Sequence, residues 1–434
     1  MKKECVYKSN VIRRGIPDFR DIRDIIREYI SDNRASDEPF YIVDLDKVEE
    51  QYNKWVEYLP DIQPFFAVKS NPDSNIIDLL ANLGCNFDCA SKNELINIMS
   101  VVNDADRIIF ANPCKISSHL MYARESKIGM MTFDSIEELE KIYNIYPEAL
   151  LLLRISVDDT NSMCKFNSKF GCPQGNIPQI FERIKSLRMN LVGFSFHVGS
   201  GCSDASSFYN AIKDCAASYK LSLDYGVSQF SQFSQFSQPP YIIDIGGGFP
   251  GVDKNIKFAD ICDNINKAIA DYFSFSPDIN NINNINKQIR FIAEPGRYFT
   301  EATHTLVINV IAKKKEAGVI KYYLNDGIYG SFNCINYDHQ KPVLTPLLSR
   351  DENDAQYNST FFGPTCDSLD CLYKDVPFVE LNVGEWLYIE NFGAYTVSPS
   401  SSFNGFSVTN KKYIYTDTYT DTYTDTYTDT YTDI

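Results

Sequence analysis

The chain has 434 residues, of which 44% are hydrophobic and 23% charged, and its formal net charge is −16. These proportions are those of an ordinary soluble globular protein, and the length favours one large domain plus a smaller one. The acidic balance argues against a nucleic-acid-binding surface, which needs clustered lysine and arginine, and it fits an enzyme that acts on a small molecule.

The N-terminus and the cysteines indicate the compartment. The opening residues MKKECVYKSN lack the apolar segment of a signal peptide, and no stretch approaches 18 consecutive apolar residues. The twelve cysteines are scattered, with no CxxC pair and no Cys/His cluster at zinc-ligand spacing. We therefore expect a cytoplasmic protein with reduced cysteines, no membrane association and no metal site.

From residue 41 to residue 300, short apolar strands alternate with amphipathic helical stretches. The segment SIEELEKIYNIY, residues 135–146, predicts a helix, because apolar residues recur at three- and four-residue spacing after a Ser-x-x-Glu capping box. About eight strand–helix units of this kind predict a (β/α)8 barrel of the TIM type. The candidate strands are FYIVDL, PFFAVK, RIIFAN, LLLLRISV, LVGFSFHV, YIIDIGGG and IRFIAEPG.

The sequence pattern changes from Ala302 onward. Strand-like segments such as THTLVINVIAKKK and VELNVGEWLYIENFG are there separated by turns, with few helical stretches between them. We therefore expect residues 301–412, together with residues 1–40, to form an antiparallel β-sandwich or barrel domain beside the 41–300 barrel. Two low-complexity inserts, SQFSQFSQFSQPP (228–240) and DINNINNINK (278–287), predict surface loops or disorder. The TDTY repeat of residues 413–434 has no Leu, Val or Phe to bury and predicts a disordered tail.

Chemically active residue types recur where the candidate barrel strands end. Lys69 ends PFFAVK, His197 ends LVGFSFHV, and Glu294 follows IRFIA. In a (β/α)8 barrel the C-terminal ends of all strands meet at one mouth, where the active site lies. We therefore expect these three side chains to face one another.

Three features near the same strand ends suit a phosphate group. The run Gly246–Gly248 offers unhindered backbone N–H groups, Ser200 offers a hydroxyl, and Arg297 offers a fixed positive charge. A glycine run alone is equally explained by a turn that needs positive φ. The combination at successive strand ends favours a phosphate-binding site.

Lys69 and Glu294 add the requirements of an aldehyde cofactor with a ring nitrogen. Lys69 is flanked by Phe65, Phe66 and Val68, which predicts a partly desolvated amine with a lowered pKa that can form a Schiff base. The alternative is a lysine whose stem lies along apolar surface while its charge stays in water. Glu294 needs a cationic partner in such a site, and a protonated ring nitrogen would supply it. Taken with the phosphate features, these residues describe pyridoxal 5′-phosphate.

Longer stretches of the chain resemble a known family. They are PFFAVKSNPD, FDCASKNEL, FSFHVGSGC, IDIGGGFPG, IAEPGRYF, YYLNDGIYGSFNCINYDH, FFGPTCDSLD and ENFGAYTVSPSSSFNGF. With them the chain resembles the eukaryotic ornithine decarboxylase family, in the alanine-racemase-like group (group IV) of pyridoxal-phosphate-dependent decarboxylases. The resemblance runs from about Tyr41 to Phe406 and leaves out the inserts and the tail.

The resemblance implies that Lys69 binds pyridoxal 5′-phosphate as a Schiff base. It implies further that Glu294 pairs with the ring nitrogen and that His197 stacks on the ring face. The other residues that it assigns to the cofactor are Asp88, Arg154, Ser200, Gly248, Pro295, Gly296, Arg297 and Tyr395.

The resemblance also implies a homodimer whose active sites are shared between subunits. The loop GPTCDSLD would bring Cys366, which governs reprotonation at the substrate Cα, and Asp367 into the partner's barrel. Tyr337 and Asp338 would come from the subunit that binds the cofactor, and Asp338 and Asp367 would hold the distal ammonium of the substrate. Without the surrounding match, the thiol of Cys366 would be taken as buried and inert. The implied activity is decarboxylation of L-ornithine to putrescine and CO2, the first step of polyamine biosynthesis.

Two other functions fit part of this pattern. A decarboxylase of lysine, arginine or another basic amino acid is close, because one methylene changes discrimination by only ~1–3 kcal/mol. Diaminopimelate fits less well, because Asp338 and Asp367 would repel its second carboxylate. A catalytically inactive homologue that binds an antizyme-like regulator is the alternative from another class, although the cofactor residues named above are all present here.

Overall fold

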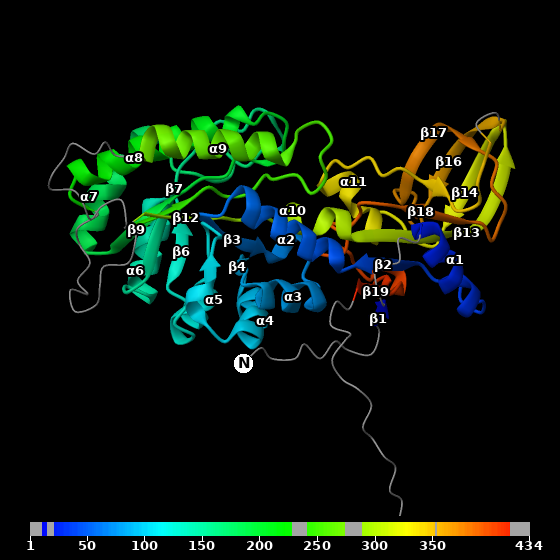
Figure 1. Ribbon diagram of the computed structural model, residues 1–434, viewed down its shortest axis with the longest axis horizontal. Coiled ribbons are helices and arrows are strands. Elements are labelled where there is room, and N and C mark those ends of the chain that lie inside the picture. Colours follow the sequence, from blue (N-terminus) through cyan, green and yellow to red (C-terminus); the bar gives the residue numbers. More distant parts are fainter. Residues whose placement is uncertain (1–10, 15–20, 228–240, 274–288, 352–353, 417–434) are drawn as a thin grey trace, which may run out of the picture.

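The computed structural model describes residues 11–14, 21–227, 241–273, 289–351 and 354–416, and it divides into a barrel and a β-domain (Figure 1). The two inserts, and the tail from residue 417 onward, lie outside the described residues. In Figure 1 the barrel lies to the left, ringed by helices, and the β-domain lies to the right.

Eight parallel strands close into a barrel in the order β11-β12-β3-β4-β5-β6-β7-β9, which confirms the predicted barrel. Two of them, β4 and β6, are four residues long and were missing from the candidate strands, because NFDC and MMTF are short and only partly apolar. The barrel strands are β3 (Ile62–Ala67), β4 (Asn86–Cys89), β5 (Ile108–Phe110), β6 (Met130–Phe133), β7 (Leu150–Arg154), β9 (Asn190–Ser195), β11 (Tyr241–Asp244) and β12 (Ile289–Ala293).

Helices surround these strands, and one of them precedes the first barrel strand. This helix, α2, lies between α9 and α3: the Asn266 amide of α9 donates to the Tyr58 carbonyl of α2 at 3.3 Å, and α2 also contacts α3. It thus takes the place of a long helix after the last strand. The helices of the barrel are α2 (Asp46–Tyr58), α3 (Ser74–Leu83), α4 (Lys92–Val102), α5 (Ser117–Glu125), α6 (Ile136–Ile145), α7 (Ile177–Leu187), α8 (Ser206–Asp224) and α9 (Phe258–Phe273).

The helix predicted from the capping box is confirmed. The Ser135 hydroxyl accepts the backbone N–H of Glu138 at 3.2 Å, which satisfies one of the free donors at the start of α6. Leu139 and Ile142, at helical spacing, are buried against the rest of the core.

Because side chains alternate between the two faces of a strand, the barrel interior is built of layers. Side chains such as Leu152, Ile242 and Ile292 pack together as a separate apolar cluster. Residues two positions further along each of these strands point to the same face, and they are Arg154, Asp244 and Glu294. An apolar layer therefore forms the floor beneath a polar layer at the barrel mouth.

The predicted β-domain beside the barrel is confirmed, and its sheet is mixed, because antiparallel pairs such as β13–β14 occur together with parallel ones. Its strand order is β1-β19-β2-β13-β14-β16-β17, with β18 beside β13 and β15 beside β18. The pairs β1–β19, β19–β2 and β14–β16 are parallel, because strands far apart in the chain are joined through the barrel or through long connections. The elements are β1 (Val11–Arg14), α1 (Ile22–Asp32), β2 (Phe40–Asp44), β13 (His304–Glu316), β14 (Val319–Leu324), β15 (Thr345–Pro346), β16 (Gln356–Phe362), β17 (Cys371–Val379), β18 (Trp386–Ile389) and β19 (Asn410–Thr416).

Two predicted boundaries are wrong. FYIVDL was taken as the first barrel strand, but β2 pairs with β13 and β19 in the β-domain, and the barrel begins at β3. Its apolar run shows burial on both faces without showing in which sheet. The tail was predicted to begin at residue 413, but β19 continues to Thr416, and Ile414 is buried.

The remaining elements are short and lie around the mouth of the barrel or in connections. Within the described ranges no helix is both long and apolar enough to cross a membrane. The eleven cysteines in this part of the chain are unpaired. The short elements are β8 (Ser162–Cys164), β10 (Ser200–Cys202), α10 (Arg297–Thr300), α11 (Cys334–Tyr337) and the 3-10 turns η1 (Val68–Ser70), η2 (Ala105–Arg107), η3 (Gln174–Asn176), η4 (Glu301–Thr303), η5 (Ser331–Asn333) and η6 (Phe403–Gly405).

Candidate active site

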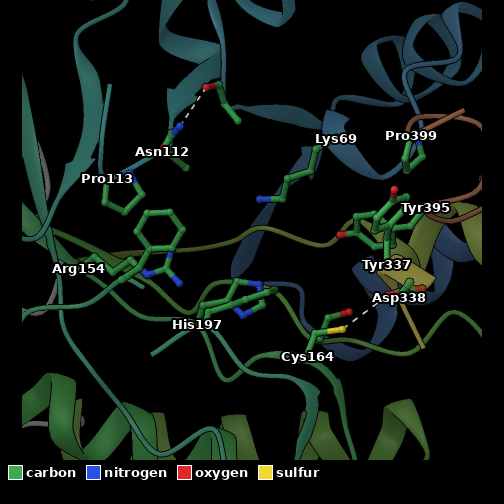
Figure 2. Close-up of a pocket in the computed structure, with 15 residues that line it drawn as sticks. Lys69, Asn112, Pro113, Arg154, Cys164, His197, Tyr337, Asp338, Tyr395 and Pro399 are labelled. Atoms are coloured by element: carbon green, nitrogen blue, oxygen red, sulfur yellow. Dashed lines mark hydrogen bonds between the residues drawn. The ribbon is translucent and has the colours of Figure 1, made fainter. Parts of the chain in front are cut away.

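A cavity of about 350 Å³ lies at the C-terminal ends of the barrel strands. Figure 2 shows the Lys69 side chain extending into this space, with Arg154 and His197 on one side and Tyr337 and Tyr395 on another. The volume is within the range of small-molecule and cofactor sites. The cavity is lined by Lys69, Ala90, Ala111, Asn112, Pro113, Arg154, Cys164, Phe166, Phe170, His197, Ser200, Tyr337, Asp338, Tyr395 and Pro399.

Lys69 lies in η1, directly after β3, and carries the amine of the cavity. Its Nζ forms an ion pair with Asp88 Oδ2 at 3.1 Å, and 43% of its side chain stays accessible because it faces the cavity. Burial acts to lower the pKa of Lys69, but the negative charges of Asp88 and Glu294 outweigh it and raise the pKa above its ordinary value. The lowered pKa predicted from the apolar flanks is therefore wrong, because the neighbouring strand ends supply carboxylates.

Three carboxyl groups meet in the polar layer of the barrel. The side chains of Glu294 and Asp244 are hydrogen-bonded to each other, and Asp244 Oδ1 also accepts the Gly246 N–H at 2.9 Å. Burial, followed by the charges of Asp244 and Asp88, raises the pKa of Glu294 well above its usual range, and burial raises that of Asp244 to about 7. Asp88 Oδ1 and Asp244 Oδ2 are buried with no hydrogen-bond partner in the described part of the chain. The layer has more carboxyl groups than cations, so Glu294 and Asp244 retain a proton between them.

His197 is held as a neutral ring at the edge of the cavity. Its Nδ1 accepts the N–H of Gly199 at 2.9 Å, so the neutral ring carries its proton on Nε2. Burial, followed by the positive charges of Arg154 and Lys69, lowers its pKa well below the usual value. The Phe166 ring meets it edge-on, with the ring centroids 4.9 Å apart. A neutral imidazole fixed in this way suits packing against a flat ring.

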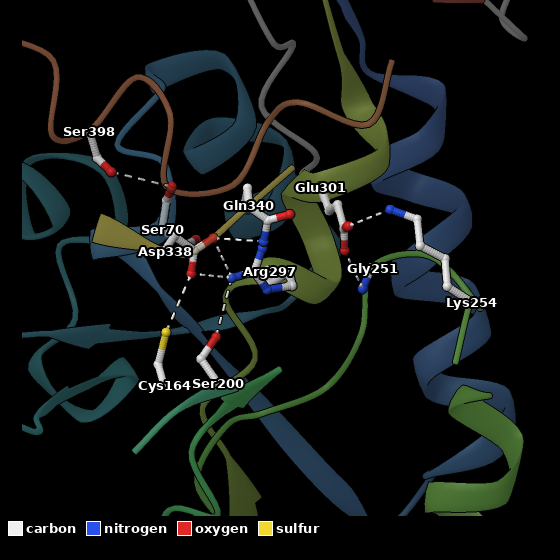
Figure 3. A network of polar contacts seen from close by, with 10 residues as sticks. All are labelled: Ser70, Cys164, Ser200, Gly251, Lys254, Arg297, Glu301, Asp338, Gln340 and Ser398. Atoms are coloured by element: carbon white, nitrogen blue, oxygen red, sulfur yellow. Dashed lines mark hydrogen bonds and ion pairs between the residues drawn. The ribbon is translucent and has the colours of Figure 1, made fainter. Parts of the chain in front are cut away.

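Arg297 is the cation at the end of β12, and Figure 3 shows its contacts. Its guanidinium donates to the Ser200 hydroxyl at 3.2 Å and to both oxygens of Asp338 at 2.7 Å. It also lies over the Tyr395 ring, 5.1 Å from the centroid. Burial acts to lower its pKa, but Asp338 outweighs this and raises it. Ser200 and Arg297, both predicted to bind phosphate, are thus brought together.

Asp338 lines the cavity but forms an ion pair that the sequence did not predict. The resemblance assigned it to the distal ammonium of the substrate, whereas here its carboxylate pairs with Arg297 and also accepts the Gln340 amide at 2.9 Å. It still lines the cavity, beside Tyr337, whose side chain is 72% exposed. A pairing between two groups with different predicted roles could not be read from their separation in sequence.

Glycines at the strand ends allow the backbone to approach closely. A Cβ on Gly247 would lie 2.8 Å from His197 Nε2, and one on Gly248 would lie 2.7 Å from the Gly199 carbonyl oxygen, where Gly248 also has a φ of +107°. A Cβ on Gly296 would lie 3.0 Å from the Ser70 Cβ. The glycine run is therefore explained by close packing as well as by its exposed backbone.

The remaining predicted cofactor residues lie around the same mouth. Arg154 ends β7, its pKa is lowered by burial, and its guanidinium lies 5.2 Å from the centroid of the Phe170 ring. The Pro295 carbonyl accepts the Ala67 N–H at 3.1 Å, which continues the pairing of β12 with β3. Tyr395 has a left-handed φ of 56°, and its backbone N–H donates to the Ser70 carbonyl at 2.9 Å.

Cys366 and Asp367 are the predicted residues that the structure does not bring to the cavity. Cys366 is exposed on the loop before β17, and its N–H donates to the Asn404 side chain at 2.9 Å. Asp367 accepts the Tyr329 hydroxyl and the Leu369 N–H, and these contacts lower its pKa. Neither residue lines the space around Lys69.

Several lining residues were missed from the sequence. Asp244, which is buried beside the cavity and does not line it, had a usable signal, because it is an acidic residue at the end of an apolar strand, two residues before the glycine run. Asn112 and Pro113 likewise follow a predicted strand, RIIFAN. Phe166 and Phe170 had no signal, since they lie in an irregular segment after β8 that reaches the cavity only through the fold. No group of three His, Cys, Asp or Glu in the described ranges could hold a metal ion.

Known sequences resemble this chain over most of its length. A family profile described as "Pyridoxal-dependent decarboxylase, pyridoxal binding domain" matches residues 45–301. The chain is 40% identical to the ornithine decarboxylase of Caenorhabditis elegans over 94% of each protein. It is 41% identical to that of Schizosaccharomyces pombe, covering 91% of this chain and 88% of the relative. It is also 38% identical to antizyme inhibitor 2 of Xenopus laevis, covering 90% of this chain and 84% of the relative.

Solved structures share the architecture. The arginine decarboxylase of Paramecium bursaria Chlorella virus superposes with a TM-score of 0.81 at 30% identity, covering 90% of this chain and 100% of that one. A structure of SrLDC in complex with PLP and cadaverine superposes with a TM-score of 0.77 at 29% identity, covering 91% and 94%.

Proposed function

Because this chain belongs to the pyridoxal-dependent decarboxylase family, we propose that it decarboxylates L-ornithine to putrescine and CO2, the first step of polyamine biosynthesis. The observation that carries the proposal is the arrangement around Lys69. An accessible amine lies beside buried carboxylates, and with Glu294 and an arginine–serine pair it lines a smaller pocket next to the main cavity. Ornithine is favoured as substrate because relatives named ornithine decarboxylase match 90% or more of the chain.

The residues present fit pyridoxal 5′-phosphate. Lys69 supplies the amine that binds its aldehyde, and Arg297 with Ser200 supplies donors for its phosphate beside the glycine run. Glu294 supplies the acceptor for a protonated ring nitrogen. Its raised pKa and the buried Asp88 Oδ1, which has no hydrogen-bond partner among the described residues, favour a cation here, which such a ring would provide.

The chemistry of decarboxylation divides between the bound group and this chain. When bound, pyridoxal phosphate accepts the electron pair left on the substrate Cα as CO2 departs. Glu294 keeps the ring nitrogen protonated, and this proton is what makes the ring a good electron acceptor. His197 stays neutral, so it packs against the ring without adding a charge that would oppose the one at the nitrogen. Asp88 neutralises the Lys69 ammonium and holds its Nζ at the mouth of the barrel.

We propose that Asp338 and the partner's copy of the 366–370 loop bind the distal end of the substrate. Asp338 lines the cavity, and its carboxylate can exchange Arg297 for an ammonium group once Arg297 is drawn to a phosphate. Cys366 is exposed and Asp367 half-buried, and neither lines its own Lys69 cavity, which leaves the loop accessible to a second subunit. The functional unit is therefore proposed to be a homodimer with shared sites, in which Cys366 governs the proton returned to Cα.

The experiment that tests the activity is CO2 release from a panel of amino acids. Purified protein with added pyridoxal phosphate is given L-ornithine, L-lysine, L-arginine and diaminopimelate. We expect kcat/KM to be highest for ornithine, with some activity on lysine, since one methylene is worth only ~1–3 kcal/mol. A higher kcat/KM for lysine or arginine would overturn the substrate assignment and leave the reaction class in place.

The similarity to antizyme inhibitor 2 favours one second function, an inactive homologue that binds an antizyme-like regulator. The two functions differ in the cofactor. The enzyme is supported by an absorbance band of lysine-bound pyridoxal on the purified protein. Borohydride treatment should remove this band and the turnover together. Binding of an antizyme without any such band or turnover would favour the regulator. For either function we propose a cytoplasmic location, which a fluorescent fusion in cells would test.

A further inference from the structure

The segment that follows Lys69 is held in place by the β-domain. The Ser70 carbonyl accepts the Tyr395 N–H at 2.9 Å and the Ser398 hydroxyl at 3.5 Å, the second of which is drawn in Figure 3. One residue further on, the Asn71 amide donates to the Gly393 carbonyl at 2.8 Å. These contacts come from the loop after β18, which belongs to the other domain.

A second set of contacts reaches Asp73, four residues after Lys69. Asp73 Oδ1 accepts the N–H groups of Asn75 and Ile76 at 3.0 and 3.3 Å and so caps the start of α3. Its Oδ2 accepts from Lys411 Nζ and from the Tyr413 hydroxyl, the latter at 2.7 Å. One carboxylate thereby joins the start of a barrel helix to the last strand of the β-domain. We call Asp73, Lys411 and Tyr413 the Asp73 clamp.

The Asp73 clamp is buried, so its loss is not made good by water. Asp73 is 5% exposed, and the Lys411 side chain is 17% exposed. Burial acts to raise the pKa of Asp73, but Lys411 and the hydroxyl of Tyr413 outweigh it and lower the pKa. Removing the lysine leaves a buried charge without its cation, which is costly in a low-dielectric site.

We propose that Lys411 and Tyr413 are positioning residues for Lys69 and act through Asp73. The segment between Asp73 and Lys69 contains only Ser70, Asn71 and Pro72. With Asp73 fixed at one end and Ser70 tied to Tyr395, the η1 turn is held at both sides, and the Lys69 amine keeps its place opposite Asp88. The proposal rests on the proposed function only in taking Lys69 as the lysine that binds the cofactor.

The test measures hydrogen–deuterium exchange of the full chain before pyridoxal phosphate is added. In Lys411→Met we expect the amides of residues 68–77 to exchange roughly tenfold faster or more, the loss typical of a hydrogen bond to a charged group. Amides of α7, on the far side of the barrel, should stay within about twofold. Tyr413→Phe removes a single hydroxyl and should give a smaller change in the same segment, about threefold.

Two further variants make the result specific. Lys412→Met removes a positive charge from the neighbouring position of the same strand, where the ammonium lies 5.1 Å from the Tyr29 ring centroid, and it should leave residues 68–77 unchanged. Lys411→Arg keeps the charge and should restore most of the protection. In the loaded enzyme, Lys411→Met should weaken pyridoxal phosphate binding by about tenfold while the KM for the amino acid changes less than about twofold, since none of the three clamp residues lines the cavity.

Three results would overturn the proposal. One is unchanged exchange of residues 68–77 in both Lys411→Met and Tyr413→Phe. Another is faster exchange throughout the barrel, which would make the clamp a general source of stability. The third is an equal effect of Lys412→Met. If no amino acid is decarboxylated by the wild-type protein, the proposed function fails, whereas the exchange data still decide the clamp.

Discussion

The two groups of residues assigned to the active site lie in different surroundings. The Lys69 group lies in the mouth of the barrel, and its polar members contact one another: Lys69 with Asp88, Arg297 with Ser200 and Asp338. The Cys366 group is on an exposed loop of the β-domain, outside the cavity. One chain therefore builds the part that fits the cofactor and presents the part proposed for substrate and proton transfer to its surroundings.

The two groups also differ in which contacts hold their side chains in position. Barrel strands fix the Lys69 group through the register of a closed sheet, and clamp contacts from the β-domain reinforce it. The loop of Cys366 is held by its own hydrogen bonds, such as those from Thr365 to Asp370, and by others to Asn404 and Tyr329. The proposed homodimer therefore brings a preformed loop, and not a loop that must first be ordered, to the cavity of the partner subunit.

The largest effect is expected from removing the amine of the Lys69 group. Lys69→Ala should abolish CO2 release and remove the absorbance of lysine-bound pyridoxal, because no other amine lines the cavity among the described residues. Lys92→Ala is a matched control, since that lysine begins α4 and lies over the Tyr122 ring of α5, and it should keep activity within about twofold. Near-normal turnover by Lys69→Ala would contradict the assignment.

The next largest loss of activity is expected from neutralising a carboxylate of the Lys69 group. Glu294→Gln should lower kcat/KM for ornithine by roughly a hundredfold, about 2.7 kcal/mol, because a neutral amide no longer keeps the ring nitrogen protonated. The exposed Glu182→Gln on α7 should leave the rate unchanged. A loss below about threefold would show that another group, such as Asp244, holds the nitrogen.

The positions of the Lys69 group could be predicted from the sequence better than those of the Cys366 group, for a physical reason. Strand ends converge in any (β/α)8 barrel, so Lys69, His197 and Glu294 could be grouped without coordinates. The pairing of Arg297 with Asp338 could not, because it depends on where α11 returns to the barrel. The domain to which β2 belongs, the parallel pairs of the β-domain and the raised pKa of Lys69 likewise depend on neighbours distant in sequence.

A smaller effect is expected in the stability of the protein without added cofactor. Burial raises the pKa of Asp244 from 3.8 to about 7, so the folded state holds this proton more tightly than the unfolded chain. The contribution is fully present below about pH 4 and is lost as the pH rises to about 7, lowering the free energy of unfolding by roughly 2–4 kcal/mol.

Denaturant titrations between pH 4 and pH 8 check this slope. Asp244→Asn should remove much of it, whereas Asp260→Asn, at an exposed position of α9, should leave it unchanged. A stability that rises over this range in the wild type, with the same rise in Asp244→Asn, would refute the buried carboxyl pair.

The smallest effects on activity are expected from deleting segments that belong to neither the Lys69 group nor the Cys366 group. Residues 228–238 precede β11, whose far end leads to Gly246, so their deletion falls at the end of the strand away from the cavity. Deleting residues 228–238 or 417–434 should leave kcat/KM within about threefold, under ~0.7 kcal/mol. Truncation from residue 415 should destabilise the protein more, because it removes the end of β19 and the bond from the Tyr415 hydroxyl to Glu49. A hundredfold loss from either of the first two deletions, in a folded protein, would place those segments at the site.

The contrast between the two halves is tested most directly by mixing subunits. Lys69→Ala and Cys366→Ala are each expected to be inactive or nearly so, and each leaves the other half intact. If the halves of one site come from two chains, equal mixing with free exchange restores about a quarter of wild-type activity, because half of the dimers are hybrids and each hybrid has one intact site. Exchange is followed independently with two affinity tags. Recovery near one quarter supports the account, and no recovery despite confirmed exchange would show that Lys69 and Cys366 serve the same chain.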